Sequence, residues 1–572
     1  MVGAAVDERL ERSVASVSQE RLTAHIAQLA RRSKHAGTPG ELESLRFVER
    51  EIASYGYRTE LILHEAYISL PGAARLVALD AEHRCITHSF SRPAAALEAR
   101  LVDVGRGDDA GYAGRQVAGA AVLVDGIATP ASTVAARLRG AVAQIHISPH
   151  EYLHEMCVSP VWGSPDDETV DELPATTVVT VELATGEELR HACAAGEVTV
   201  RLDAAVDTGW RRTPTLVADL PGPLGDDDEP FVLLSGHHDT WHLGVMDNGG
   251  ANATMLEVAR LCALERAHWR RGLRVAFWSG HSQGRYSSSA WYADNRWVEL
   301  ELRAVAHVNV DSTGGRGNTV VSDTTASAEL HGLAREALAA RAGQEFTGRR
   351  TERAGDQSFW GIGVPSIFAN MSEQPAGETN ASAAVFGGGL RRGAGTGWWW
   401  HTPHDTEDKI DPDILVRDTR VYQHAVWRLL ASPVPPLDYA EAARELTTRL
   451  EALQQGGGRG LDLCLRRAAE LEHRMARMRD AHGADPVRTS ECLRRLSRVL
   501  VPVTYTRGDR FGHDPALAQP ALPALAGASR LALLPPGSDD HRFLASRLVR
   551  EANRIAWALR EAIDIVDRYL DG

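Results

Sequence analysis

The sequence predicts an α/β fold built on a mainly parallel sheet, and three apolar segments support this prediction. Residues 231–234 (FVLL), 273–277 (LRVAF) and 304–310 (AVAHVNV) are runs of the length that buried strands have. Each run ends in polar residues, and a helical pattern starts near Ala251 after the first of them. In such sheets, ligands bind beyond the carboxyl ends of the strands.

The segment before these strands predicts two helices and a strand. In residues 8–32 the apolar residues recur at three- and four-residue intervals, which predicts one amphipathic helix. The sequence HAGTPGE (35–41) predicts a turn into a second helix that ends near Gly56. Residues 57–70 alternate between apolar and polar, as a half-buried strand does.

Changes in the sequence pattern along the chain predict three domains. Between about residues 71 and 213, short apolar runs are separated by Gly, Pro and Asp turns, which predicts a β-rich insertion. Beyond about Ser432 the pattern is mostly helical. We therefore expect a main domain formed by residues 1–72 and 213–432, an inserted domain over 73–212 and a C-terminal helical domain over 433–572.

Composition excludes several classes of partner. The net charge of −14 argues against nucleic acid, because phosphate binding needs clustered Lys and Arg. No apolar run approaches the roughly 20 residues that a membrane span needs. The six cysteines are scattered, and acidic residues stand where a signal peptide needs an apolar core. The sequence predicts a soluble cytoplasmic protein with reduced thiols and no membrane partner.

Polar residues that suit a metal ion follow several of the predicted strands. His237 and Asp247 come after the first strand, Asp311 ends the strand at 304–310, and His401 follows a run of three tryptophans. Imidazole and carboxylate groups at strand ends suit zinc or a similar divalent ion. Taken alone, residues 231–260 also fit a surface loop with incidental polar residues.

Six ordered features resemble the co-catalytic di-zinc aminopeptidase family, in particular the branch of glutamate carboxypeptidase and the transferrin receptor. They are HAGTPGE, the β-rich insertion, GHHDTWHLGVMDNGG (236–250), VNVDS (308–312), WHTPHDTEDKID (400–411) and the C-terminal helical region. The resemblance implies a mixed, mainly parallel sheet with helices on both faces. It also implies a protease-associated-like insertion, and a homodimer paired by the C-terminal domain.

The resemblance also implies a ligand set. His237 would bind one zinc ion, the Asp239 carboxylate would orient the His237 ring, Asp247 would bridge two ions, and Asp311 would complete the first site. His401 would belong to the second site, although a capping or core histidine is an alternative. Four other histidines are expected to be structural: His238, His242, His307 and His404.

The sequence departs from the family at one place. Family peptidases carry two adjacent glutamates after the strand that corresponds to LRVAF: a general base and a zinc ligand. Aligned on the family's tryptophans at Trp278 and Trp291, this chain has His281 at the base position and Ser282 at the ligand position. One zinc ion is therefore expected. The second site is either empty or completed by His281, which is otherwise suited to act as the base.

These observations favour a metal-dependent hydrolase that cleaves an amide bond of a small peptide or an N-acyl amino acid. Arg285 and Tyr286 lie near the predicted site and are candidates for substrate binding, with Arg285 holding a carboxylate. A surface salt bridge is the alternative for Arg285. Two other functions remain open: a lyase or cyclase that uses one metal ion, and a non-catalytic, receptor-like protein.

Overall fold

The computed structural model describes residues 2–571 except 224, 226, 227, 378–391, 459 and 481–484. Three helices come first, α1 (Val2–Ala15), α2 (Gln19–Leu29) and α3 (Pro39–Ser54). The prediction of a single helix over residues 8–32 is wrong, because the helix is interrupted between α1 and α2. The Ser18 hydroxyl caps α2 by accepting from Arg21 N, and Ser18 N donates to the Glu257 carboxylate. The turn at Thr38 and the helix after it are confirmed.

The main sheet is mixed and mainly parallel, as predicted. Its neighbouring strands, in spatial order, are β12 (Ser366–Ile367), β11 (Ala304–Asn309), β9 (Phe231–His237), β10 (Gly272–Trp278) and β8 (Val198–Leu220). The first four are parallel to one another, and β8 is antiparallel to β10. Every residue of β9, β10 and β11 is buried, which explains their continuous apolar sequences.

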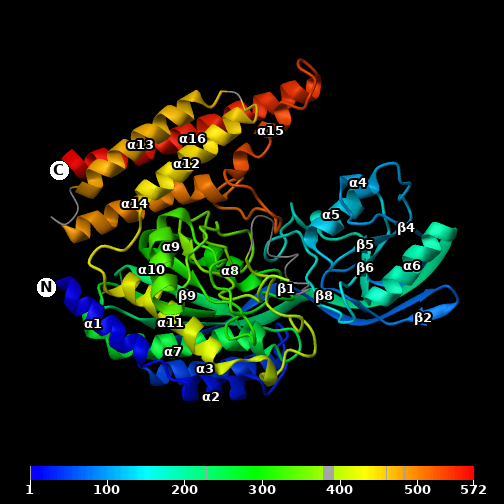
Figure 1. The fold of residues 1–572 in the computed structure, drawn as a ribbon, viewed down its shortest axis with the longest axis horizontal. Helices are drawn as coiled ribbons and strands as arrows, with labels where there is room; N and C mark the ends of the chain where they lie inside the picture. Colours follow the sequence, from blue (N-terminus) through cyan, green and yellow to red (C-terminus); the bar gives the residue numbers. More distant parts are fainter. Residues whose placement is uncertain are drawn as a thin grey trace.

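Helices cover both faces of this sheet. Helices α7 (Ala251–Leu264), α10 (His331–Ala342) and α11 (Pro412–Ala431) pack together beside α1 and α2. The shorter α8 (Ser287–Asn295) and α9 (Trp297–Arg303) follow β10, with α9 leading into β11. Figure 1 shows α2, α3 and α7 below the sheet and α8 and α9 above it.

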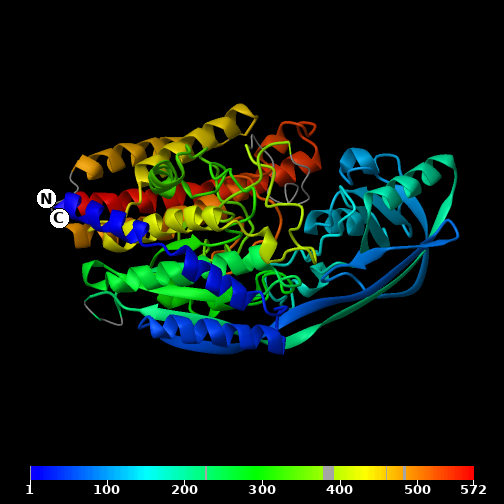
Figure 2. The same cartoon turned by 60° about the horizontal axis from the view of Figure 1, so that its bottom comes forward.

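A long antiparallel ribbon joins the main sheet to the insertion. Strand β1 (Arg58–Ala78) pairs with β8 from Arg58 opposite Asp219 to Ala78 opposite Val200. Figure 2 shows this ribbon running from the main sheet into the insertion. The domain limits expected near residues 72 and 213 therefore fall inside continuous strands.

The insertion alternates strands and helices. Strands β4 (Ala94–Asp103), β5 (Ala121–Asp125), β6 (Ala143–Ile147) and β7 (Thr177–Val181) are parallel. Short β3 (Cys85–Thr87) pairs antiparallel with β7, and short β2 (Ala81–His83) pairs antiparallel with β1. Three helices interrupt the strands: α4 (Asp109–Tyr112), α5 (Pro130–Leu138) and α6 (Leu183–Ala195). The predicted strands are present. The description as simply β-rich missed α5, whose start carries a capping box at Thr129 and Ser132.

The C-terminal region is helical, as predicted. It consists of α12 (Tyr439–Gln455), α13 (Asp462–Asp480), α14 (Pro486–Tyr505), α15 (Ala528–Leu531) and α16 (Asp539–Asp571). Figure 1 shows these helices side by side above the main sheet. Among the described residues, no helix is both long and apolar enough to cross a membrane.

One buried arginine fastens this helical region to the main sheet. The Arg498 guanidinium, on α14, donates to the carbonyl oxygens of Leu300 (3.1 Å), Ala304 (2.5 Å) and Gly363 (2.8 Å). The first two of these carbonyls lie at the end of α9, where Arg494 also donates to the Leu302 carbonyl oxygen. Burial lowers the pKa of Arg498 to about 9, so the side chain remains charged at neutral pH.

We expect Arg498→Ala to lower the free energy of unfolding by about 2–4 kcal/mol, because several buried carbonyl oxygens lose a charged donor. Urea unfolding measures the change. Arg495→Ala is the matched control on the same helix, since Arg495 is 59% exposed and pairs with Glu491 one turn away. Its expected change is within about 0.5 kcal/mol. Equal effects of the two substitutions would contradict this role for Arg498.

Candidate active site

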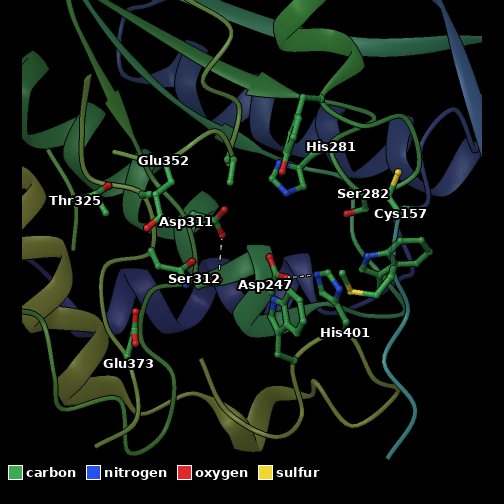
Figure 3. Close-up of a pocket in the computed structure, with 18 of the residues that line it drawn as sticks. Cys157, Asp247, His281, Ser282, Asp311, Ser312, Thr325, Glu352, Glu373 and His401 are labelled. Carbon is green, nitrogen blue, oxygen red and sulfur yellow. Dashed lines mark hydrogen bonds and ion pairs between the residues drawn. The ribbon is translucent and has the colours of Figure 1, made fainter. Parts of the chain in front are cut away.

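Parallel strands bring the predicted site residues together at one edge of the main sheet. His237 is the last residue of β9, His281 follows the end of β10 and Asp311 follows the end of β11. Asp247 lies on the turn before α7, and His401 lies on the loop that precedes α11. Figure 3 shows His281, Asp311, Asp247 and His401 around a common space.

Asp247 lies between two imidazole rings. One of its oxygens is 3.1 Å from His237 Nε2, and the other is 3.0 Å from His401 Nε2. Asp311 Oδ1 is 3.8 Å from the same nitrogen of His237. Burial would raise the pKa of Asp247, but the two histidines hold the pKa of this carboxyl well below its usual range. Asp247 is therefore an anion at neutral pH, with one oxygen for each ring.

The hydrogen bonds of these rings indicate that a cation belongs between them and Asp247. His237 Nδ1 is 2.7 Å from the Asp239 carbonyl oxygen, and His401 Nδ1 is 2.6 Å from the Glu155 carbonyl oxygen. A carbonyl oxygen only accepts, so the proton of each neutral ring lies on Nδ1. Each Nε2 can therefore meet the Asp247 carboxylate in two ways: with a second proton, as an imidazolium, or through a bound cation. A divalent ion such as zinc would take the place of those protons and be held by the same atoms, so the residues present fit a metal ion.

A buried carboxylate positions the Asp247 turn. Asp405 accepts from the backbone N–H groups of Met246 (2.8 Å) and Asp247 (3.0 Å). Burial raises the pKa of Asp405 to about 7. On the same turn, the buried Lys34 ammonium donates to the Leu243 carbonyl oxygen at 2.8 Å. The HTPHD loop thus supplies both His401 and the group that holds its partner, Asp247.

The structure changes the expected role of Asp239. Its carboxylate lies 3.9 Å from His237 Nδ1, so the ring is oriented by the Asp239 backbone carbonyl instead. The carboxylate accepts from the backbone N–H groups of His281 (3.1 Å) and Ser282 (2.8 Å). Asp239 therefore fixes the loop that carries His281 and Ser282.

The HAGTPGE segment supports the same loop. The Gln283 amide oxygen accepts from Ala36 N at 2.8 Å, and the Gln283 amide nitrogen donates to the Thr240 carbonyl at 3.2 Å. This bridge joins the turn before α3, the segment after His237 and the loop after β10.

His281 lies against the predicted metal ligand His237. Its ring stacks on that of His237, with ring centroids 3.8 Å apart and an angle of 17° between the planes. One ligand atom each from His237, His281 and Asp311 lie within 4.8 Å of one another. His281 Nδ1 is 2.7 Å from an oxygen of the buried Asp356. Burial would raise the pKa of Asp356, but His281 holds the pKa of this carboxyl below its ordinary value.

The insertion supplies one wall of the pocket that predicted metal ligands also line. Met156 and Cys157 come from the insertion, Trp241 and Trp400 flank His401, and Glu352 and Glu373 lie on the far side. Two hydrogen bonds join Glu155 and His401. His401 Nδ1 donates to the Glu155 carbonyl, and Glu155 N donates to the His401 carbonyl at 2.9 Å. Sequence reasoning missed these insertion residues, because no metal-ligand spacing marks them.

Arg285 and Tyr286 also line the pocket. Among the described residues, Arg285 forms no salt bridge, and its guanidinium carbon lies 5.1 Å from the centre of the Tyr286 ring. The surface salt bridge considered from the sequence is therefore not formed within the described chain. Tyr286 is buried between Trp162 (ring centroids 4.2 Å apart) and His281 (4.8 Å).

The other histidines near the site hydrogen-bond or stack within the protein. His238 Nδ1 lies 2.7 Å from the Asn252 amide oxygen, and His307 Nε2 lies 2.8 Å from Ser235 Oγ. Burial lowers the pKa of His238 to about 3 and that of His307 to about 4. His242 lies 4.0 Å from the Glu155 carboxylate, and His404 packs edge-on against Tyr152.

The site residues named above fall in a segment that matches a known family, apart from the insertion residues and the N-terminal turn. Residues 215–426 match the model of peptidase family M28. This segment belongs to peptidase family M28. It contains all four predicted metal ligands and His281.

Two curated relatives each align with 41% of this chain. The chain is 26% identical over 252 residues to the probable glutamate carboxypeptidase VP8 of Zea mays, covering 41% of this chain and 34% of that protein. It is 27% identical over 250 residues to leupeptin-inactivating enzyme 1 of Streptomyces exfoliatus, covering 41% and 55%. The chain thus spans about a third to about half of the length of these two relatives.

The fold of this chain is similar to the folds of solved peptidase structures. An aminopeptidase from Aneurinibacillus sp. strain AM-1 matches with a TM-score of 0.55 at 20% identity, covering 74% of this chain and 96% of that one. A peptidase M28 precursor from Shewanella amazonensis matches with a TM-score of 0.57 at 17% identity, covering 76% and 97%. These matches confirm the zinc aminopeptidase-like fold predicted from the sequence.

We expect Asp247→Ala to abolish stable metal binding, since both imidazoles would lose the carboxylate they share. Elemental analysis of the purified protein after dialysis against trace zinc measures the metal content. Asp408→Ala is the matched control on the neighbouring loop, because the Asp408 side chain is 66% exposed. Full wild-type metal content in Asp247→Ala would contradict the ligand set.

Proposed function

We propose that this chain is a metal-dependent hydrolase that cleaves an amide bond of a small peptide or an N-acyl amino acid. The arrangement of His237, Asp247 and His401 carries this proposal, because two Nε2 atoms and the two oxygens of one buried carboxylate face one another and could bind cations between them. The M28 segment and the aminopeptidase-like fold support it.

The ligands divide between two positions. His237, Asp247 and Asp311 would hold one zinc ion. His401 and the second oxygen of Asp247 face the position of a second ion, which lacks the family's carboxylate because Ser282 stands there. A bound zinc ion supplies Lewis-acid chemistry: it polarises the amide carbonyl and makes water a stronger acid.

Proton transfer and substrate binding depend on other residues of the chain. His281 occupies the position of the general base and lies against the ligand His237. Arg285 offers a guanidinium without a salt bridge among the described residues, at the wall of the pocket beside Tyr286. A free carboxylate on the substrate would pair with this cation and would orient the amide bond toward the metal position.

We expect Arg285→Gln to raise KM for an N-acyl amino acid by roughly tenfold or more, with a smaller change in kcat, since a charge-assisted hydrogen bond is lost. The matched control is the same substrate with its carboxylate converted to an amide, for which KM should hardly change. A shift of the same size for both substrates would contradict carboxylate binding by Arg285.

The reaction type is tested with H₂¹⁸O and wild-type protein loaded with zinc. Hydrolysis places one ¹⁸O atom in the new carboxyl group of the product. A product formed without incorporation of ¹⁸O would indicate elimination or cyclisation instead. Conversion of no dipeptide or N-acyl amino acid would sink the hydrolase proposal.

We also propose that the chain forms a homodimer through its C-terminal helices. Helix α16 exposes large apolar side chains, with Phe543 at 72% and Trp557 at 64% exposure. These two residues are 14 positions apart, close to four helical turns, so they lie near one face of the helix. Apolar side chains on one face of a long helix are typical of a contact with another subunit.

We expect sedimentation at micromolar concentration to show a dimer for the wild-type protein and a monomer for Trp557→Glu, because a charge would be buried in the contact. Val487→Glu is the control, since Val487 is exposed on α14. A wild-type protein that sediments only as a monomer would contradict this proposal.

A further inference from the structure

A buried carboxylate outside the predicted ligand set touches the site through His281. Asp356 Oδ2 lies 2.7 Å from His281 Nδ1, and Asp356 Oδ1 accepts from the Ser289 hydroxyl at 2.9 Å. Asp356 is 1% exposed. An ionised carboxylate only accepts hydrogen bonds, so Nδ1 of His281 carries the proton. In the neutral ring, the other nitrogen, Nε2, keeps its lone pair.

The orientation of the ring distinguishes a base from a metal ligand. The lone pair of an imidazole nitrogen lies in the plane of its ring, so an ion bound by two imidazoles lies in both planes. The planes of His237 and His281 are stacked at 3.8 Å and inclined by only 17°, so they do not meet near the two rings. An ion on His237 Nε2 therefore lies beside His281 and is not coordinated by it.

The contacts around the pair resist a rotation that would bring His281 onto the ion. Ser289, which holds the second oxygen of Asp356, is also 2.9 Å from Ser358 Oγ. Ser358 accepts from the indole N–H of Trp162, a residue of the insertion, at 2.9 Å. On the other side, the backbone N–H of His281 is bound to the Asp239 carboxylate.

We propose that Asp356 is a positioning residue that holds His281 as the general base, with its proton on Nδ1 and its Nε2 lone pair available. This inference rests on the proposed function. Nε2 removes one proton from the attacking water as the water oxygen bonds to the amide carbon. The Asp356 carboxylate stabilises the imidazolium that results. The same proton then passes to the leaving nitrogen as the C–N bond breaks, and His281 returns to its neutral form.

The test is a double-mutant cycle on the zinc-loaded, full-length protein. We expect Asp356→Asn to lower kcat on the order of 10²-fold and His281→Ala to lower it 10²- to 10⁴-fold, each with little change in KM. The double variant should match His281→Ala, because Asp356 acts only through His281. Zinc stoichiometry and zinc affinity, measured by chelator competition, should equal those of wild type in all three variants.

A second Asp–His pair provides the matched control. Asp294 Oδ1 lies 2.9 Å from His513 Nε2, and neither residue lines the pocket. Asp294→Asn should leave kcat, KM and zinc content unchanged. Independent, additive losses in the Asp356→Asn, His281→Ala cycle would overturn the proposal, because they would indicate a structural role. Loss of zinc in His281→Ala would overturn it as well, since His281 would then be a ligand.

One readout needs neither substrate nor metal. In metal-free protein labelled with ¹⁵N-histidine, long-range ¹H–¹⁵N correlation spectra distinguish the two neutral tautomers, and His281→Gln identifies the resonance. We expect the Nδ1–H form in wild type and a loss of that preference in Asp356→Ala. An Nε2–H tautomer in wild type would overturn the role of Asp356 even if hydrolysis is observed. A wild-type protein that cleaves no amide would overturn the proposed function separately.

Discussion

The site depends on the interaction of one buried carboxylate, Asp247, with two imidazole rings. The geometry is demanding, since both rings use Nδ1 on a carbonyl oxygen and turn Nε2 toward one buried carboxylate, which leaves room for a cation between them. The surrounding structure holds the groups in this arrangement by backbone contacts: Asp405 binds two N–H groups of the Asp247 turn, and carbonyl oxygens fix each ring. A cation at the centre is the simplest way to stabilise such an arrangement.

The insertion takes part in this centre through its backbone. Residue 155 exchanges two hydrogen bonds with His401, and neighbouring residues form a wall of the pocket. Because β1 and β8 run without interruption from the main sheet into the insertion, the two parts are joined by a stiff ribbon as well as by this contact. A displacement of the insertion would therefore change the orientation of His401. The Glu155 carboxyl lies 4.0 Å from His242, and burial raises the pKa of this carboxyl to about 8.

The sequence predicted the strands of the main sheet and the grouping of His237, Asp247, Asp311, His281 and His401 well, because strand ends and motif order carry that information. It did not predict contacts between distant segments. Asp356 lies 75 positions from His281, and no local pattern joins them. The break between α1 and α2 was missed because the apolar spacing continues across Ser18, while its cap and its bond to Glu257 are visible only in three dimensions. Asp239 was expected beside His237 and lies there, but its backbone carbonyl, not its carboxylate, orients the His237 ring.

In the proposed site, His281 and Ser282 stand where the resemblance places the family's two glutamates, with different consequences for the base position and the ligand position. The base position keeps a proton acceptor, supported by a buried carboxylate, whereas the ligand position receives a neutral hydroxyl. The central claim is thus a metal ion on Asp247 with His281 beside it. Anomalous diffraction on both sides of the zinc absorption edge tests it most directly. The account predicts a peak about 2.0–2.2 Å from His237 Nε2 and from an Asp247 oxygen, outside bonding distance of His281. Zinc-soaked crystals without a peak there, or with a peak bonded to His281, would contradict it.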